Sequence, residues 1–112
     1  MLSANEKTFS KMVLDSSQPV LVHFWAPWCG LCRLIVPALL KFQSEADGQL
    51  QLIGINADEN LKLASIYRLK SLPTLLFFEN GQLVHRSEGF NGRDELQKTL
   101  NAIAASFWAR SA

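Results

Sequence analysis

Two cysteines with two residues between them carry the clearest chemistry in this sequence. Cys29 and Cys32 are the only cysteines of the chain. A thiolate is the nucleophile of thiol–disulfide exchange, and a second thiol one helical turn away can attack the mixed disulfide that the first one forms. A structural bridge over so short a loop constrains the unfolded chain little. The spacing therefore predicts a redox pair, with metal binding as the other use of such a pair in a reducing compartment.

The pair stands where a predicted strand passes into a predicted helix. The run Val20–Trp25 is almost continuously apolar, which is typical of a strand buried on both faces. From Gly30 to Glu45 apolar residues recur at helical spacing, at Leu31, Leu34, Ile35, Ala38, Leu39 and Phe42. Cys29 comes just before this helix, whose free N–H groups and dipole favour a negative charge. We therefore expect Cys29 to ionise readily and attack the substrate, and the more buried Cys32 to resolve the mixed disulfide.

The remaining segments alternate between helix and strand patterns. The pattern predicts a first helix capped by Asn5, strands at Leu50–Asn56, Thr74–Phe78 and Gln82–Glu88, a helix at Glu59–Leu69 and a last helix capped by Asn91. Asn80-Gly81 predicts a tight hairpin between the last two strands. The apolar stripe continues past Pro37, so we expect that helix to be kinked there rather than to end.

These elements predict one domain over residues 1–112, of the α/β class. Strands that alternate with helices favour a parallel sheet core, and the hairpin adds an antiparallel edge. Met1–Ala4 carry little strand pattern, so we expect a central mixed four-stranded sheet, with the first edge strand short or absent, flanked by four helices. Nearly half the residues, 48%, are hydrophobic, which is enough for a core without disulfide staples.

Charge and hydropathy argue against several classes of partner. The formal net charge is +1, so nothing favours electrostatic binding to nucleic acid or to a membrane. No apolar run approaches the roughly 20 residues of a membrane span, and we expect no secretory signal at the N-terminus. These features predict a cytoplasmic protein, or one inside an organelle after removal of a transit peptide.

The segment Trp25-Ala26-Pro27-Trp28-Cys29-Gly30-Leu31-Cys32 resembles the active-site segment of thioredoxins. The resemblance spans about Asn5 to Ile103 and includes four further features, namely Pro37, Leu72-Pro73-Thr74, Phe78-Glu79-Asn80-Gly81 and Gly89. It implies a thioredoxin fold and a thiol–disulfide oxidoreductase that acts on protein disulfides through a mixed disulfide. It also implies a monomer without a bound cofactor, which takes electrons from a reductase or a small thiol that the sequence does not identify.

The same resemblance implies a surface for substrates around the cysteines. The family carries a cis-proline facing them, which would be Pro73, whereas an ordinary trans-proline is the alternative. Leu72 would offer backbone groups to an extended substrate. Trp28 would border the site, and the remaining members of this surface would be Gly30, Leu31 and Gly89.

Three residues depart from the usual thioredoxin pattern. His23 replaces a buried aspartate, Gly54 replaces a lysine and Leu31 replaces a proline. A neutral imidazole can accept a proton near neutral pH, so His23 is a candidate to take the proton of Cys32. The alternative is a core histidine satisfied by a backbone carbonyl or by water. Leu31 supplies an amide that proline lacks, which should stabilise a Cys29 thiolate and make the couple more oxidising.

Two other functions stay open on the sequence alone. In the first, the chain is a protein-binding module whose redox turnover is incidental. In the second, Cys29 and Cys32 bind a metal ion together with His23 or a second chain, although two thiolates fall short of the usual four zinc ligands.

Overall fold

A mixed five-stranded sheet runs through the centre of the molecule. The structure is a computed structural model that describes residues 1–111, with side chains to residue 107. The strands are β1 (Leu2–Ser3), β2 (Val20–Trp25), β3 (Gln51–Asn56), β4 (Thr74–Glu79) and β5 (Gln82–Ser87). Their order in the sheet is β1-β3-β2-β4-β5. Strand β3 pairs in parallel with β1 and β2, whereas β4 runs antiparallel to both β2 and β5.

The first strand is the short edge strand that the sequence left open. Leu2 and Ser3 pair with Ile53 and Gly54 of β3. The number of strands in the sheet is therefore five rather than four. Two residues are too few to show the alternation by which a strand is recognised in sequence. The sheet is otherwise the one predicted, with a parallel core and an antiparallel hairpin at its edge.

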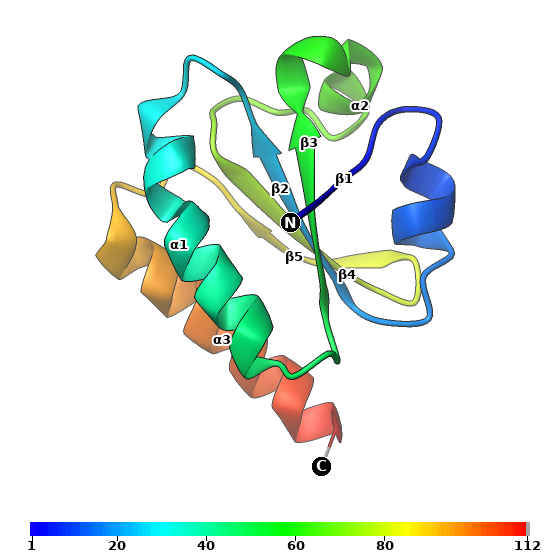
Figure 1. Cartoon of the computed structure of the whole chain (residues 1–112), viewed down its shortest axis with the longest axis vertical. Coiled ribbons are helices and arrows are strands. Elements are labelled where there is room, and N and C mark those ends of the chain that lie inside the picture. The colour runs from blue at the N-terminus through cyan, green and yellow to red at the C-terminus, as the bar shows by residue number, and fades with distance from the viewer. Residues whose placement is uncertain (112) are drawn as a thin grey trace.

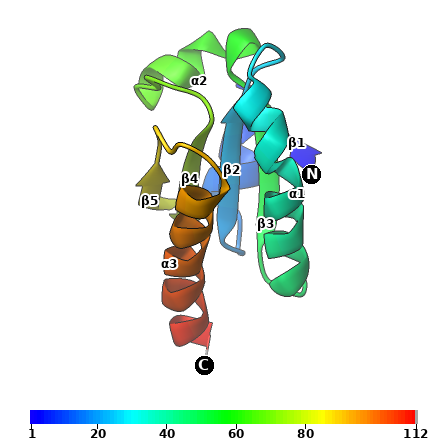
Figure 2. The same ribbon diagram turned by 90° about the vertical axis from the view of Figure 1, so that its left-hand side faces the viewer.

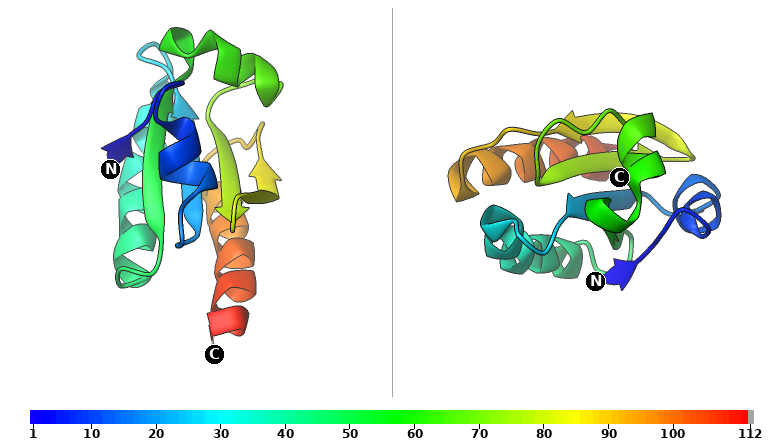
Figure 3. Two further views of the ribbon diagram at one scale, coloured as in Figure 1. Left: turned by 90° about the vertical axis from the view of Figure 1, so that its right-hand side faces the viewer. Right: turned by 90° about the horizontal axis from the view of Figure 1, so that it is seen from above.

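Helices cover both faces of the sheet. They are η1 (Ser10–Leu14, a π-helix), α1 (Gly30–Glu45), the 3-10 turn η2 (Ala57–Glu59), α2 (Leu61–Ile66) and α3 (Arg93–Ser111). Helices α1 and α3 lie side by side against one face, and η1 lies on the other (Figures 1, 2 and 3). One core lies between the sheet and the pair α1–α3, and a second lies between the sheet, η1 and α2.

Helix α1 has the predicted bounds, and it continues past Pro37. Its buried residues are Cys32, Ile35, Leu39 and Phe42, which recur every three or four residues. Leu34 was expected on this inner face, but it is 46% exposed. The buried stripe is therefore narrower than predicted, since Leu34 lies on the flank of α1 that faces the start of α3.

The predicted helix caps differ in outcome. Asn5 caps the turn that leads into η1, because its Oδ1 accepts a hydrogen bond of 3.1 Å from the N–H of Thr8, whereas η1 itself begins at Ser10 with Phe9 as its N-cap. The Asn91 prediction is wrong, since α3 begins two residues later and the carbonyl of Gly92 accepts the N–H of Leu96 at 3.1 Å. The N–H of Asn91 instead donates to the Glu95 carboxylate at 2.8 Å. Glu95 in the first turn of α3 thus reaches back to the backbone just before the helix, as the glutamate of a capping box does.

The hairpin between β4 and β5 forms at Asn80 and Gly81, as predicted. Both have positive φ, 52° and 77°, which suits a two-residue turn. Gly81 is constrained a second time, because a Cβ atom there would lie 2.7 Å from the backbone oxygen of Leu14. The turn therefore closes against the end of η1 only when residue 81 lacks a side chain.

We predict that Gly81→Ala destabilises the fold more than Gly48→Ala. Gly48 has nearly the same φ, 79°, but a Cβ there would meet no heavy atom within 4 Å. The positive φ alone should cost Gly48→Ala about 1 kcal/mol in free energy of unfolding. Gly81→Ala adds the steric contact with Leu14 and should cost about 2–3 kcal/mol. Equal losses in urea unfolding would show that the contact with Leu14 is unimportant.

Candidate functional site

The two cysteines form a disulfide at the N-terminus of α1. Their Cα atoms are 5.3 Å apart. Cys29 is the N-cap of α1, and its Sγ accepts a hydrogen bond of 3.1 Å from the N–H of Cys32. A turn precedes this helix. The N–H of Cys29 closes the turn by donating to the carbonyl of Ala26 at 3.1 Å. The sulfur of Cys29 therefore accepts a hydrogen bond from one of the N–H groups that have no partner within the helix.

The two sulfur-bearing residues differ in accessibility in the predicted order. Cys29 is 6% exposed and Cys32 is 2% exposed. Both pack in a small apolar cluster with Ala26, and Leu31 and Leu72 cover it. Cys29 therefore keeps the outer position, from which it can meet a substrate first.

Trp28 stands out from the surface beside the disulfide, and Asp58 fixes its indole. Trp28 is 68% exposed, and its Nε1 donates to the Asp58 carboxylate at 2.8 Å. Asp58 was not predicted as a site residue. Strands β2 and β3 are parallel and end level with each other, at Trp25 and Asn56. Residues that follow both strands must then meet at one edge of the sheet, which is the pattern that could have revealed Asp58.

The loop before β4 also reaches the disulfide. The Leu72–Pro73 peptide bond is cis. Leu72 packs against the cluster that contains both cysteines, and Pro73 is buried. The hydroxyl of Thr74 donates to the carbonyl of Ser71 at 2.6 Å, which closes this loop on itself.

The other residues of the predicted substrate surface lie around the first turn of α1. Gly30 opens the helix, and a Cβ there would meet no heavy atom within 4 Å. Leu31 is half-buried and contacts both the disulfide cluster and the α1–α3 core. Gly89 has φ 67° and lies in the exposed loop between β5 and α3, which runs near the start of α1 (Figure 1).

His23 lies behind the disulfide and is buried. It is 1% exposed, and neither Nδ1 nor Nε2 has a hydrogen-bond partner among the described residues. Burial lowers the pKa of His23 from 6.5 to about 4, because desolvation disfavours the charged imidazolium. The imidazole is therefore neutral at pH 7. No backbone carbonyl of the described residues satisfies it, so of the structural alternative only satisfaction by water stays open.

A pocket of about 200 Å³ connects His23 with Cys32. We call it the His23 pocket, and it is lined by Met1, Leu2, Ser3, His23, Trp25, Cys32, Arg33, Val36 and Gly54. Gly54 pairs with His23 across β2 and β3. A Cβ atom at Gly54 would lie 3.0 Å from Met1 Sδ and 3.3 Å from Trp25 Nε1. Met1 and Trp25 therefore pack closely over Gly54, where thioredoxins usually carry a lysine, and a side chain at residue 54 would displace these two walls of the pocket.

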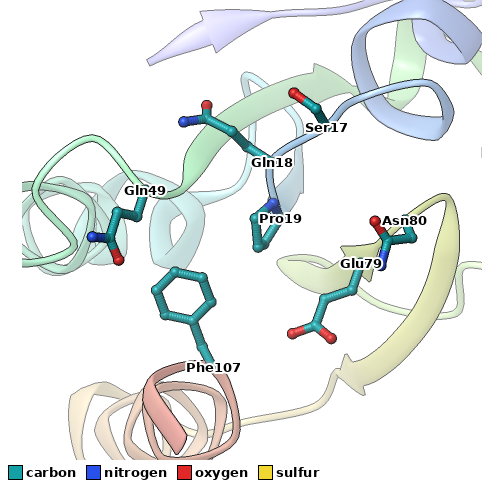
Figure 4. Close-up of a pocket in the computed structure, with 7 residues that line it drawn as sticks. All are labelled: Ser17, Gln18, Pro19, Gln49, Glu79, Asn80 and Phe107. Atoms are coloured by element: carbon teal, nitrogen blue, oxygen red, sulfur yellow. The ribbon is translucent and has the colours of Figure 1, made fainter. Parts of the chain in front are cut away.

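A larger groove of about 530 Å³ lies at the opposite end of the sheet (Figure 4). It is lined by Ser17, Gln18, Pro19, Gln49, Glu79, Asn80 and Phe107. This lining contains no thiol or imidazole. The groove lies where β2 begins, whereas the cysteines follow the end of β2, so the redox chemistry does not involve it.

Neither a metal cluster nor a membrane span is found among the described residues. No group of three or more histidine, cysteine, aspartate or glutamate side chains is arranged to hold a metal ion within residues 1–111. Within the same range, no helix is both long enough and apolar enough to cross a bilayer.

Comparison with known proteins agrees with this geometry. The sequence profile of the family described as Thioredoxin matches residues 1–102. Thioredoxin 1 of Nostoc sp. is 42% identical over 95 residues, which is 85% of this chain and 89% of the relative. Thioredoxin 1 of Synechococcus elongatus is 40% identical over 99 residues, 88% of this chain and 92% of the relative. A chloroplastic thioredoxin M5 of rice is 44% identical over 79 residues, 70% of this chain and 46% of the relative.

A disulfide-competent pair at a helix start, on a mixed sheet between two helix layers, defines a thiol–disulfide oxidoreductase. The chain belongs to the thioredoxin family. The interpretation as a binding module with incidental redox turnover is therefore not favoured.

We predict that His23 makes the fold sensitive to acid. The unfolded imidazole binds a proton near pH 6.5 and the folded one only near pH 4, so between these values the unfolded state holds more protons. Lowering the pH from 6.5 to 4 should therefore cost up to about 3 kcal/mol in free energy of unfolding. His23→Leu should lose much less over this range, whereas His85→Gln on β5 should behave like wild type. Urea unfolding at several pH values measures this, and an unaltered acid loss in His23→Leu would contradict it.

Proposed function

We propose that the chain reduces or exchanges disulfides of other proteins, with Cys29 as nucleophile, Cys32 as resolving thiol and His23 as proton acceptor. The observation that carries the assignment of Cys29 is its position as N-cap of α1, with the Cys32 N–H 3.1 Å from its sulfur. Hydrogen bonds and a helix N-terminus stabilise a thiolate more than a thiol. Cys32 has no comparable place on the surface, since it is 2% exposed.

The reaction then runs in two exchanges. The Cys29 thiolate attacks a substrate disulfide, and one substrate sulfur leaves as a thiolate while a mixed disulfide forms. Cys32 loses its proton and attacks Cys29, which releases the second substrate thiolate and restores the Cys29–Cys32 disulfide. Two electrons pass to the substrate in the cycle, and no bound cofactor takes part in it.

The second exchange needs an acceptor for the Cys32 proton, and His23 is placed to be that acceptor. Both residues line the His23 pocket. At pH 7 the imidazole is neutral and neither nitrogen is engaged by another described residue, so a lone pair is free. Burial lowers the pKa of His23 to about 4, so the imidazolium would form only transiently, as the Cys32 sulfur attacks, and would then give the proton up to solvent. The other titratable side chain of the lining besides these two is Arg33, a cation that cannot accept a proton.

The residues around the disulfide provide the surface for a protein substrate. Trp28 offers an exposed indole that Asp58 holds in place, and such a ring suits an apolar contact with a partner. The loop at Leu72 and Pro73 would pair its backbone with an extended substrate segment. Gly30, Leu31 and Gly89 would complete this surface, with the two glycines leaving room for the substrate chain.

The partners and the cellular site are proposed on the family relationship. The chain would act as a single domain and a monomer, reduced either by a reductase or by small thiols. Cyanobacterial relatives favour the cytoplasm, and relatives named as chloroplastic favour an organelle interior. The Leu31 amide lies in the first turn of α1, where N–H groups lack helical partners, and would make the couple more oxidising than in thioredoxins with proline there.

We predict that His23→Ala slows resolution of the mixed disulfide and makes it depend more steeply on pH. Without an internal acceptor, the Cys32 proton must go to hydroxide or water, so the deficit should be about a hundredfold at pH 7 and shrink toward pH 9. Stopped-flow measurement of product release from a trapped mixed disulfide gives this rate. His85→Ala is the matched control and should match wild type. A resolution rate in His23→Ala that is unchanged from pH 6 to pH 9 would end this role for His23.

A further inference from the structure

The His23 pocket reaches the disulfide from a side that the substrate surface does not use. Its lining includes Cys32, whereas Cys29, Trp28 and Leu72 are not among the described residues that form it. Its outer part is formed by exposed side chains, those of Met1, Leu2 and Arg33. A small molecule that enters past them would therefore meet the buried half of the disulfide, with a protein substrate or without one.

The interior of this pocket is chemically unusual for an apolar site. Trp25, Val36 and Met1 supply apolar wall, and the imidazole of His23 is the buried polar group within it. A buried polar group normally has a partner, yet neither ring nitrogen of His23 finds one among the described residues. A volume of about 200 Å³ is several times the share of about 30 Å³ that one water molecule takes in the liquid. The site therefore has room for a small organic molecule that bears a hydrogen-bond donor.

Leaving-group stability favours attack on Cys32 rather than on Cys29. Exchange is faster when the departing thiolate is the more stable one. Attack on Cys32 expels Cys29, whose sulfur already accepts the Cys32 N–H at the helix start. Attack on Cys29 expels the sulfur of Cys32, which is almost fully buried. The departing thiolate is therefore more stable when Cys32 is attacked than when Cys29 is attacked. Only thiols small enough to reach Cys32 can react there.

We propose that the His23 pocket admits small uncharged thiols to Cys32 and so forms a second entrance to the disulfide for low-molecular-weight reductants. The S–H group donates to the free nitrogen of His23, and the thiol sulfur attacks Cys32 as its proton leaves through the imidazole. A bond forms between the small thiol and Cys32, and the Cys29–Cys32 bond breaks to leave the Cys29 thiolate. A second thiol then attacks the adduct, which yields the small disulfide and the reduced dithiol, so two thiols supply the two electrons.

The same features exclude larger or charged thiols. The charged groups of the lining, the Arg33 guanidinium and the Met1 ammonium, belong to exposed residues of its outer part. A carboxylate-bearing thiol that went further in would lose its hydration in the apolar interior, beside a neutral imidazole. Glutathione, a larger charged tripeptide, is therefore restricted to the outer sulfur, Cys29.

This inference rests on cycling of the Cys29–Cys32 disulfide, but not on the role of His23 in resolving protein mixed disulfides. The two can fail separately. The resolution role is tested on a protein mixed disulfide, whereas the entrance is tested on the oxidised chain with thiols alone.

The experiment compares 2-mercaptoethanol with glutathione as reductants of the oxidised full chain. Reduction is followed by the fluorescence of Trp25 and Trp28, and the first adduct is trapped with excess N-ethylmaleimide and located by tandem mass spectrometry. We expect 2-mercaptoethanol on Cys32 with maleimide on Cys29, and a rate that saturates with thiol concentration. Glutathione should appear on Cys29, without saturation.

Two variants narrow the pocket from opposite walls. Val36→Phe does so from α1 and Gly54→Val from β3, and each should slow reduction by 2-mercaptoethanol about tenfold and abolish saturation. Their rates with glutathione should stay at the wild-type value, which also shows that the fold is intact. Leu40→Phe, one turn further along α1 and outside the lining, is the matched control and should change neither rate. The proposal is overturned if 2-mercaptoethanol is found on Cys29, or if Val36→Phe slows both thiols equally.

Discussion

The hydrogen bond from the Cys32 N–H to the sulfur of Cys29 is the contact on which the rest of this site depends. It links the backbone of Cys32 to the sulfur of Cys29, in addition to the disulfide bond between them. It forms because Cys29 is the N-cap of α1. A helix start has N–H groups without helical partners, and a sulfur held there is stabilised as an anion. The sheet and the helix packing serve to hold this junction of β2 and α1 at an edge where a substrate can reach it.

His23 and Gly54 set the character of the space behind the disulfide. In thioredoxins these places usually carry an aspartate and a lysine, which are opposite charges. Here they carry a neutral imidazole and no side chain at all, so neither position contributes a charge to the pocket of about 200 Å³ that they line. An unpartnered imidazole in the core costs stability, most of all in acid. Its position beside Cys32, in one pocket, suits it to proton transfer.

Much of this arrangement could be predicted from the sequence, because local patterns coincide with the tertiary ones. The apolar run of β2, the helical stripe of α1 and the Asn80-Gly81 turn each specify one element, and the paired cysteines mark the junction. Besides the short strand β1 and the start of α3, three features were missed that distant parts of the chain determine. Asp58 meets Trp28 only because β2 and β3 end together. Leu34 is 46% exposed on the flank of α1 that faces the start of α3, a position that only the tertiary packing decides. The His23 pocket depends on what is missing at Gly54 and on Met1, far away in sequence.

The most direct test of the central claim is the rate at which iodoacetamide alkylates Cys29 in the reduced chain as the pH is varied. If the start of α1 stabilises the thiolate, the rate should reach half of its maximum well below pH ~8.5, where a free cysteine does so, and Cys32 should be labelled far more slowly. Alkylation of Cys29 that follows pH like the thiol of glutathione, at an equal rate, would contradict the account.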